Sequence, residues 1–198
     1  MLPLGPQRHE NDFGNGVRVL HVERWLGRMT ADLSLRALLP RAPWRQEETR
    51  IGGRMVAQPR LTQWWGDKPY AYSGITHPAR PWPEWLEHLR GSVSIEARYE
   101  LTGALGNMYR DGNDCVGWHA DDEPDIVPDS PVASVTFGAP RRFCMRKIAA
   151  PKHKVEFTLA HGDMLVMGRG CQRLWQHCVP RQASVTEPRI SLTFRAMV

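Results

Sequence analysis

Three residues with metal-binding side chains are spaced so that they could meet in the fold. His119 and Asp121 stand two positions apart in "WHADDE", and His177 follows much later in "LWQHCVP". On a β-strand, residues i and i+2 point to the same face, so we expect the imidazole and the carboxylate to converge. Two histidines and one carboxylate, with other coordination positions open, suit the Fe(II) of a non-haem oxygenase. The same ligands with one water molecule also suit zinc.

The first two of these residues lie in an acidic stretch of the chain. Its acidic residues are Asp114, Asp121, Asp122, Glu123 and Asp125. Like charges this close repel one another, so the stretch is either a solvated loop or the surroundings of a bound cation. A metal ion held by His119 and Asp121 would account for it.

The C-terminal segment "RISLTFR" alternates strictly between polar and apolar residues. One face would carry Arg189, Ser191, Thr193 and Arg195, and the other Ile190, Leu192 and Phe194. The pattern is typical of an edge strand with a wet polar face. Two arginines with hydroxyls between them would also hold a small dicarboxylate, because guanidinium binds carboxylate through paired hydrogen bonds. Beside an Fe(II) site such a diacid points to 2-oxoglutarate, whose other end Asn107 and Tyr109 could bind.

The elements that must position these residues change in kind along the chain. Helical spacing predicts one amphipathic helix over 22–39, ended by Pro40, with an apolar face of Val22, Trp25, Leu26, Met29, Leu33 and Ala37. A second helix is predicted around 83–91, and the rest of 41–90 as loops with short strands. Short β-rich runs follow at 132–138, 141–147, 155–159, 164–168 and 189–198. Their spacing indicates a β-sandwich or barrel.

The composition indicates one globular domain with a basic surface. The chain has 198 residues, 41% of them hydrophobic and 24% charged, which is enough for one sizeable core. A net charge of +5, with basic residues concentrated over 41–60 and 141–154, favours a polyanionic partner. The chain shows no CxxC pair, no apolar run near the roughly 20 residues of a membrane span, and no secretory signal. We therefore expect a reduced, cytoplasmic, monomeric protein, nucleoid-associated if bacterial.

Four segments taken together resemble the AlkB family of Fe(II)/2-oxoglutarate dioxygenases. They are "NMYRDGNDCVGWHADDEP", "PVASVTFGAPRRFCMRK", "LAHGDMLVMGRGCQRLWQHCVP" and "PRISLTFR". The resemblance runs from about residue 58 to the end and is closest to members that repair alkylated nucleic acid. It implies a mainly β fold, a double-stranded β-helix (jelly-roll), with flanking helices from the N-terminal part. We expect a single domain over 1–198, with a helical and loop cover (1–57), a nucleotide-recognition region (58–100) and a catalytic core (101–198).

The resemblance also implies a reaction and the residues that carry it. Fe(II) would be held by His119, Asp121 and His177. The cosubstrate 2-oxoglutarate would be held by Asn107, Tyr109, Arg189, Thr193 and Arg195, with Arg189 on its distal carboxylate. The family reaction uses O2 to convert 2-oxoglutarate into succinate and CO2 and hydroxylates an N-methyl group on a damaged base. The product then releases formaldehyde and the restored base.

For the substrate, the resemblance implies alkylated nucleic acid carrying lesions such as 1-methyladenine or 3-methylcytosine. Tyr72 would stack on the damaged base opposite His119, with Tyr70 and Trp65 nearby, and Glu123 would contact the exocyclic amino group. The segment "IGGR" at 51–54 offers no bulky apolar wedge for opening a duplex, which favours single-stranded DNA, with RNA as an alternative.

Two other functions fit parts of the same pattern. An AlkB-like dioxygenase acting on protein or on a modified tRNA base would keep the iron and 2-oxoglutarate residues. A non-catalytic nucleic-acid-binding module with a structural metal would need neither of the two arginines of "RISLTFR".

Overall fold

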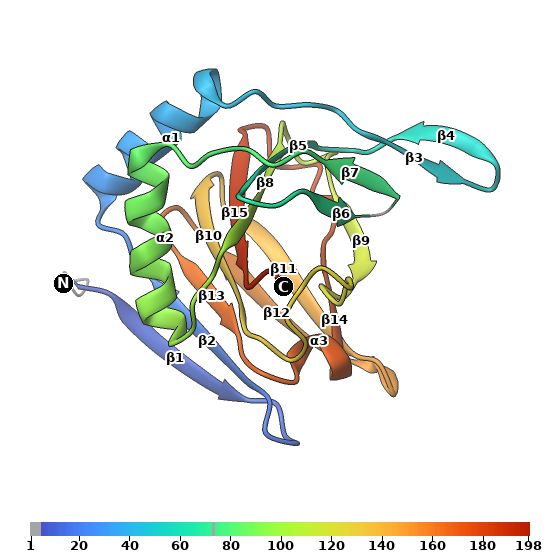
Figure 1. Ribbon diagram of the computed structural model, residues 1–198. Coiled ribbons are helices and arrows are strands. Elements are labelled where there is room, and N and C mark those ends of the chain that lie inside the picture. Colours follow the sequence, from blue (N-terminus) through green and yellow to red (C-terminus); the bar gives the residue numbers. More distant parts are fainter. Residues whose placement is uncertain (1–4, 73) are drawn as a thin grey trace.

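Two antiparallel sheets face each other in a computed structural model that describes residues 5–72 and 74–198, and only the backbone of Ile51 and Tyr72 (Figure 1). The larger sheet contains, in spatial order, β1 (Gln7–Asp12), β2 (Arg18–Glu23), β13 (Met164–Met167), β10 (Val132–Gly138), β15 (Arg189–Arg195), β8 (Gly103–Tyr109) and β5 (Leu61–Gly66). The smaller sheet contains β12 (Ala150–Leu159), β11 (Arg141–Lys147), β14 (Trp175–Val179) and β9 (Val116–His119). The predicted mainly β, jelly-roll fold is confirmed.

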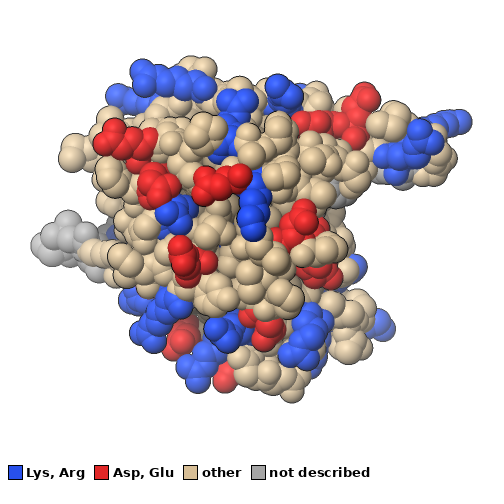
Figure 2. Space-filling view, in the orientation of Figure 1, with Lys and Arg blue, Asp and Glu red and all other residues tan. Residues whose placement is uncertain are grey.

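Two small hairpins lie outside these sheets. They are formed by β3 (Glu48–Ile51) with β4 (Arg54–Ala57), and by β6 (Tyr70–Tyr72) with β7 (Ile75–His77). The β3–β4 hairpin projects from the body of the molecule, and Figure 2 shows Lys and Arg side chains at its tip. Short strands in this region were expected from the loop-rich sequence.

The strict alternation of the last strand divides its side chains between two environments. Ile190, Leu192 and Phe194 are fully buried in the apolar cluster beneath the helices. Arg189, Ser191, Thr193 and Arg195 point to the space between the sheets and are also buried. Because β15 lies between β10 and β8, it is a central strand, and the alternative of a wet edge strand is wrong.

Helices α1 (Arg28–Arg41) and α2 (Glu84–Ala97) cover the outer face of the larger sheet (Figure 1). The prediction of a helix over 22–39 was wrong at its start, because Val22 belongs to β2. It was also wrong about the apolar face, since Met29 and Leu33 are 76% and 61% exposed. The second helix continues through Gly91 to Ala97, because its buried Leu86, Leu89 and Val93 keep helical spacing past the glycine.

The N-terminal part is more than the predicted cover of helix and loops. Strands β1 and β2 extend the larger sheet beyond β13, with Met164 paired to Val22 and Met167 to Val19. Val17, Val19 and Val22 are completely buried there. Residues 1–57 therefore contribute to the central sheet as well as covering it. No helix among the described residues is long and apolar enough to cross a membrane.

Candidate active site

The three predicted metal ligands meet at one point between the two sheets. His119 ends β9 and is paired in register with His177 on the neighbouring β14. Asp121 lies two residues beyond the end of β9, so the strand geometry we used to link it to His119 was wrong. The loop after the strand turns its carboxylate back toward the same point.

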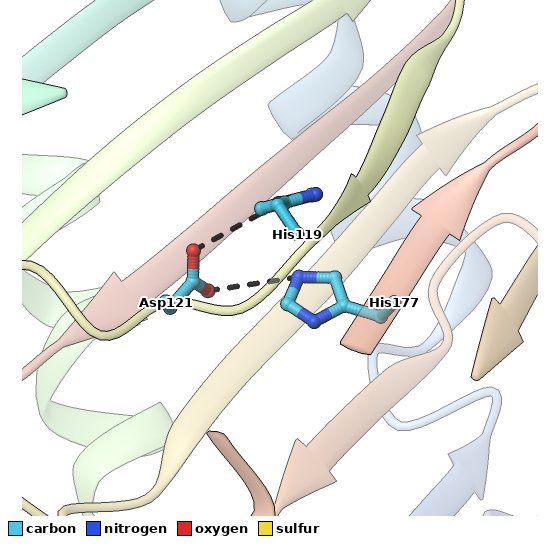
Figure 3. A group of neighbouring side chains, drawn as sticks. All are labelled: His119, Asp121 and His177. Atoms are coloured by element: carbon cyan, nitrogen blue, oxygen red, sulfur yellow. Dashed lines mark ion pairs between the residues drawn. The ribbon is translucent and has the colours of Figure 1, made fainter. Parts of the chain in front are cut away.

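Each oxygen of the Asp121 carboxylate faces one of the histidines (Figure 3). Oδ1 lies 3.9 Å from Nε2 of His119, and Oδ2 lies 3.8 Å from Nε2 of His177. These separations are too long for hydrogen bonds. Two ligand atoms that each lie roughly 2.1 Å from one ion are about 3.0–3.4 Å apart in octahedral or tetrahedral geometry, so small side-chain movements would close this site around an ion. The ligand atoms of all three residues lie within 4.8 Å of one another.

The surroundings fix both histidines in the form that binds metal. Nδ1 of His119 donates a hydrogen bond of 2.8 Å to the carbonyl oxygen of Gly117, which leaves the Nε2 lone pair facing Asp121. Burial, and next the neighbouring His119, lower the pKa of His177 to about 3. Burial also lowers the pKa of His119. Both rings are therefore neutral at pH 7, as metal ligation requires.

The Asp121 carboxylate is held in its ionised form by a buried arginine. Burial by itself would raise the pKa of Asp121, but the positive charge and the hydrogen bond of Arg195 favour the ionised form, and the pKa is lowered. Nη2 of Arg195 donates to Oδ1 at 2.9 Å, and the backbone N–H of Asp121 donates to Oε1 of Gln172 at 3.0 Å. Oδ2 is buried and accepts no hydrogen bond from any described residue. An ionised, buried oxygen aimed at a neutral imidazole fits a divalent cation.

The triad lines a cavity that a second buried arginine, Arg189, also lines. The cavity is lined by Arg60, Leu105, Asn107, Tyr109, Val116, His119, Asp121, Ser134, Phe143, Met167, His177, Val179, Arg189, Ser191, Thr193 and Arg195. Nη2 of Arg189 donates to Oγ1 of Thr136 at 3.0 Å. Its Nε and Nη1 are buried and meet no acceptor among the described residues. Burial lowers the pKa of Arg189 to about 10, so the side chain stays charged at neutral pH. These features fit a small anionic ligand.

Every residue predicted to hold 2-oxoglutarate lines this cavity, but the two arginines do not act alike. Arg195 is already paired with Asp121, whereas Arg189 has no carboxylate partner among the described side chains. Tyr109 lies between the sheets with the guanidinium of Arg189 at 5.2 Å from its ring centroid. Arg189 is therefore the arginine that can donate hydrogen bonds to a dicarboxylate.

Sequence reasoning missed Arg60, which lines the same cavity. We counted it among the surface arginines of 41–60, but it is only 5% exposed and its Nε donates to Oδ1 of Asn107 at 2.8 Å. The hydrogen bond orients the Asn107 amide toward the cavity. Arg60 follows Gln58 and Pro59 at the start of a strand, and no local pattern distinguishes it from its exposed neighbours.

Arg141 was likewise assigned to a basic surface and is buried. It is 1% exposed, and its guanidinium donates to the carbonyl oxygens of Asp111, Asp114 and Pro180. The group lies 5.5 Å from the ring centroid of Tyr109. Arg141 thus joins two loops behind the cavity rather than contributing to the outer charge.

The acidic stretch contains a candidate metal ligand, two acids with hydrogen-bond donors of their own, and Glu123. Asp114 accepts two side-chain hydrogen bonds from Arg110, at 2.8 and 2.9 Å, and lies apart from the triad. Oδ2 of Asp125 accepts from the backbone of Ala71 at 3.1 Å. Glu123 is half-buried; burial and then the charge of Asp121 raise its pKa. The repulsion in the sequence is therefore relieved at Asp114 and Asp125 by their own hydrogen bonds, whereas Glu123 and Asp121 still repel each other beside the candidate cation site.

The residues predicted to contact substrate are placed in three different ways. Tyr70 is fully buried, stacks on Trp64 at 4.6 Å, and has the guanidinium of Arg195 at 5.5 Å from its ring centroid, so it packs against Arg195 and does not itself line the cavity. The prediction that Trp65 lies near the substrate was wrong. Trp65 is in register with Ala104 of β8, and its side chain points to the opposite face of β5 from Trp64 and packs in the cluster under the helices. The side chain of Tyr72 lies outside the described residues.

Comparisons with known proteins agree with this geometry. Residues 18–195 match the 2OG-Fe(II) oxygenase superfamily. The chain belongs to this superfamily. A mouse alpha-ketoglutarate-dependent dioxygenase, alkB homolog 3, is 39% identical over 181 residues, in a match that covers 84% of this chain and 62% of that protein. The human DNA oxidative demethylase ALKBH2 is 36% identical over 158 residues, in a match that covers 75% of this chain and 60% of that protein. The resemblance to the AlkB family is confirmed.

The chain is shorter than these relatives, and its fold is similar to that of a solved structure. The chain spans about three-fifths of the length of these curated relatives, 62% and 60%. A solved structure of OsALKBH1 superposes with a TM-score of 0.63, covering 89% of this chain and 97% of that one at 18% identity. That likeness supports the jelly-roll fold. The superfamily itself is named for Fe(II) and 2-oxoglutarate, the cofactors expected from the sequence.

Proposed function

We propose that the protein removes N-linked methyl groups from alkylated bases in nucleic acid, such as 1-methyladenine and 3-methylcytosine, by oxidation. The observation that carries the proposal is the single cavity lined both by His119, Asp121 and His177 and by the charged Arg189. The relatives named as an alkB homolog and a DNA oxidative demethylase support the choice of substrate. Methylated base, 2-oxoglutarate and O2 would give the restored base, formaldehyde, succinate and CO2.

In this proposal the chain supplies binding and orientation. His119, Asp121 and His177 would hold Fe(II), which supplies the oxidising chemistry together with 2-oxoglutarate and O2. Arg189 would take the distal carboxylate of 2-oxoglutarate, while Asn107, Tyr109 and Thr193 line the space beside it. Arg195 holds the Asp121 carboxylate in place through a hydrogen bond of 2.9 Å.

The damaged base would enter from the side where Glu123 and the β6–β7 hairpin lie. A base must leave the helical stack to reach a buried metal, at a cost of a few kcal/mol that is smaller for a single strand. The carboxyl group of Glu123 would read the positive charge and amino group of the lesion, and Tyr72 would stack on the base. The exposed apolar residues of the projecting hairpin, Met55 and Val56, follow its turn rather than occupy the tip. Among the described side chains, none at the tip is therefore a bulky apolar wedge that could open a duplex. We therefore favour single-stranded DNA as the substrate; the cytoplasmic location and the monomeric state stay predictions.

The proposal is tested by following the mass of a defined substrate. Protein, Fe(II), 2-oxoglutarate and ascorbate are incubated with single-stranded oligonucleotides that carry 1-methyladenine or 3-methylcytosine. We expect each oligonucleotide to lose the mass of one methylene, with formaldehyde released. His119→Ala and Arg189→Ala should abolish the loss, whereas Arg36→Ala, at an exposed position on α1, should not. Succinate formation with both oligonucleotides unchanged would reject the proposed substrate.

A further inference from the structure

The outer face of the smaller sheet carries a tryptophan that lies against two cations. The guanidinium of Arg146 on β11 lies 4.5 Å from the ring centroid of Trp118 on β9, and the ammonium of Lys154 on β12 lies 5.8 Å from it. The neighbouring Met145 points inward and is completely buried, so Arg146 faces outward. We call Trp118, Arg146 and Lys154 the outer cation cluster.

The β11–β12 hairpin, which carries the two cations of this cluster, has a large excess of positive charge. Apart from the buried Arg141, its strands contain Arg142, Arg146, Lys147, Lys152 and Lys154 against one acid, Glu156. Glu156 lies 3.7 Å from Arg142. Within the described part of the chain, no carboxylate lies within ion-pair distance of Arg146, Lys147, Lys152 or Lys154. Figure 2 shows Lys and Arg side chains at the lower right, where the hairpin ends in Figure 1.

The partners of Arg146 orient its guanidinium without neutralising it. Its Nε and Nη2 donate to Oε1 of Gln176 at 3.0 and 2.7 Å, and the indole of Trp118 covers its face. An amide and an aromatic ring are both uncharged, so the full positive charge remains available to a ligand. Arg146 also stands directly opposite Lys154 in the strand register. Like charges in that position destabilise a sheet, and an anion bound between them would remove the cost.

The cluster is joined to the active site through strand β9. Trp118 is adjacent in sequence to His119, which lines the cavity, and β9 is an edge strand of the smaller sheet. A chain that leaves the cavity can therefore pass over this edge onto the outer face. A nucleic-acid strand carries one phosphate about every 3.4 Å of helix axis, and more widely when extended. Phosphates within a few nucleotides of a base at the metal site would reach the cluster.

We propose that the outer cation cluster binds the phosphodiester backbone of the single strand that flanks the damaged base. The choice of partner rests on the proposed function, and the site itself rests on the arrangement of the three side chains. Arg146 and Lys154 each contact a phosphate, and Trp118 holds the two head groups in place. The cluster thereby gives affinity for the strand without reading its sequence.

Binding of an unmodified oligonucleotide tests the site independently of catalysis. A fluorescent single-stranded 15-mer is titrated with protein at several salt concentrations, and its anisotropy gives Kd. In Arg146→Gln/Lys154→Gln we expect Kd to rise roughly 10-fold near 0.1 M salt, and the slope of log Kd against log salt to fall by about 1.4, since each lost phosphate contact on a single strand removes about 0.7. The matched control Arg28→Gln/Arg36→Gln removes two exposed cations from α1 and should change Kd less than twofold.

Three outcomes would overturn the inference. The first is a double variant with the Kd and salt slope of the unaltered protein. The second is an equal loss in the control, which would show that only net charge matters. The third is a poly-glutamate peptide of equal charge that binds as tightly as the 15-mer and is equally weakened by the double variant.

A length comparison separates this inference from the proposed function. A methylated trinucleotide is too short to fill both the cavity and the outer cation cluster. We expect the double variant to reduce the advantage in kcat/KM of a methylated 15-mer over the trinucleotide by about the measured change in Kd. If neither substrate is demethylated while the anisotropy results hold, the proposed function fails and the binding site stands. If both are demethylated with an unchanged ratio, the binding site fails alone.

Discussion

Replacing Arg189 with methionine is expected to stabilise the free protein while weakening its binding of 2-oxoglutarate. The guanidinium is completely buried, donates one hydrogen bond to Thr136, and keeps two further donors without an acceptor among the described residues. A buried charge without a partner opposes folding, and methionine fills a similar volume without a charge. Stability and ligand affinity should therefore change in opposite directions.

The size of the effect follows from the charge state of the buried side chain. Burial lowers the pKa of Arg189 from its ordinary value to about 10, and this difference corresponds to about 3 kcal/mol against the folded, charged form. The cost is fully present at pH 7, below the folded pKa, and would disappear only above the ordinary pKa of arginine, where the unfolded chain also loses the proton. Losing the Thr136 hydrogen bond offsets about 1 kcal/mol. Arg189→Met should thus gain about 2 kcal/mol.

Two measurements check this expectation on the same preparations. Urea unfolding of the metal-free protein at pH 7 gives the free energy of unfolding. Calorimetric titration of the Mn²⁺-loaded protein gives the affinity for 2-oxoglutarate, which we expect to fall at least about 30-fold, since truncating one partner of a buried charge pair costs about 2 kcal/mol or more. Arg36→Met, on the exposed side of α1, is the control and should change neither quantity.

A destabilised Arg189→Met protein that binds 2-oxoglutarate normally would refute the reasoning on both counts. It would mean that the guanidinium is satisfied within the fold and faces no ligand. Arg189→Lys separates charge from geometry: the charge remains, the planar fork is lost, and we expect intermediate affinity.

Three further predictions concern the core, the histidines and the metal ligand. Trp65→Ala should lower the free energy of unfolding by about 3–5 kcal/mol and leave the affinity for 2-oxoglutarate unchanged, because Trp65 packs under the helices; urea unfolding and calorimetry check this. The metal-free protein should lose stability as the pH falls from about 6.5, because the lowered pKa values of His119 and His177 leave the unfolded chain binding protons that the folded chain does not. The slope, measured by urea unfolding in a pH series, should approach about 1.4 kcal/mol per pH unit for each histidine, and His177→Asn should remove one such contribution. Asp121→Asn should abolish Fe(II) binding in equilibrium dialysis and, by leaving Arg195 buried without its carboxylate, cost about 3–5 kcal/mol in urea unfolding.

The parts of the fold and site that the sequence predicted well are those set by short-range patterns. The alternation of "RISLTFR" correctly placed four polar side chains on one face of a strand, because the period of two holds for any strand. The second-half strands at 132–138 and 141–147 were predicted at the bounds that the structure shows. The AlkB resemblance joined ligands from two separate segments, and His119 and His177 do meet.

The remaining features depend on contacts between distant segments. Trp64 and Trp65 have the same local pattern, and only the register of β5 against β8 decides that Trp64 faces Leu105 and Trp65 faces Ala104. Arg141 is buried because three backbone carbonyls from two loops accept its hydrogen bonds, which no local sequence shows. The start of α1 was misplaced because apolar residues of a strand and of the following helix happened to share helical spacing.

Anaerobic optical titration tests most directly whether one iron and one 2-oxoglutarate share the cavity. Fe(II) is added to the metal-free protein, then 2-oxoglutarate, and the visible charge-transfer band of the iron–2-oxoglutarate pair is followed. We predict a band that saturates at one iron and one 2-oxoglutarate per chain and is absent in His177→Ala and in Arg189→Met at the same concentrations. A protein without the band, or a His177→Ala variant that keeps it, would contradict the assignment of the triad.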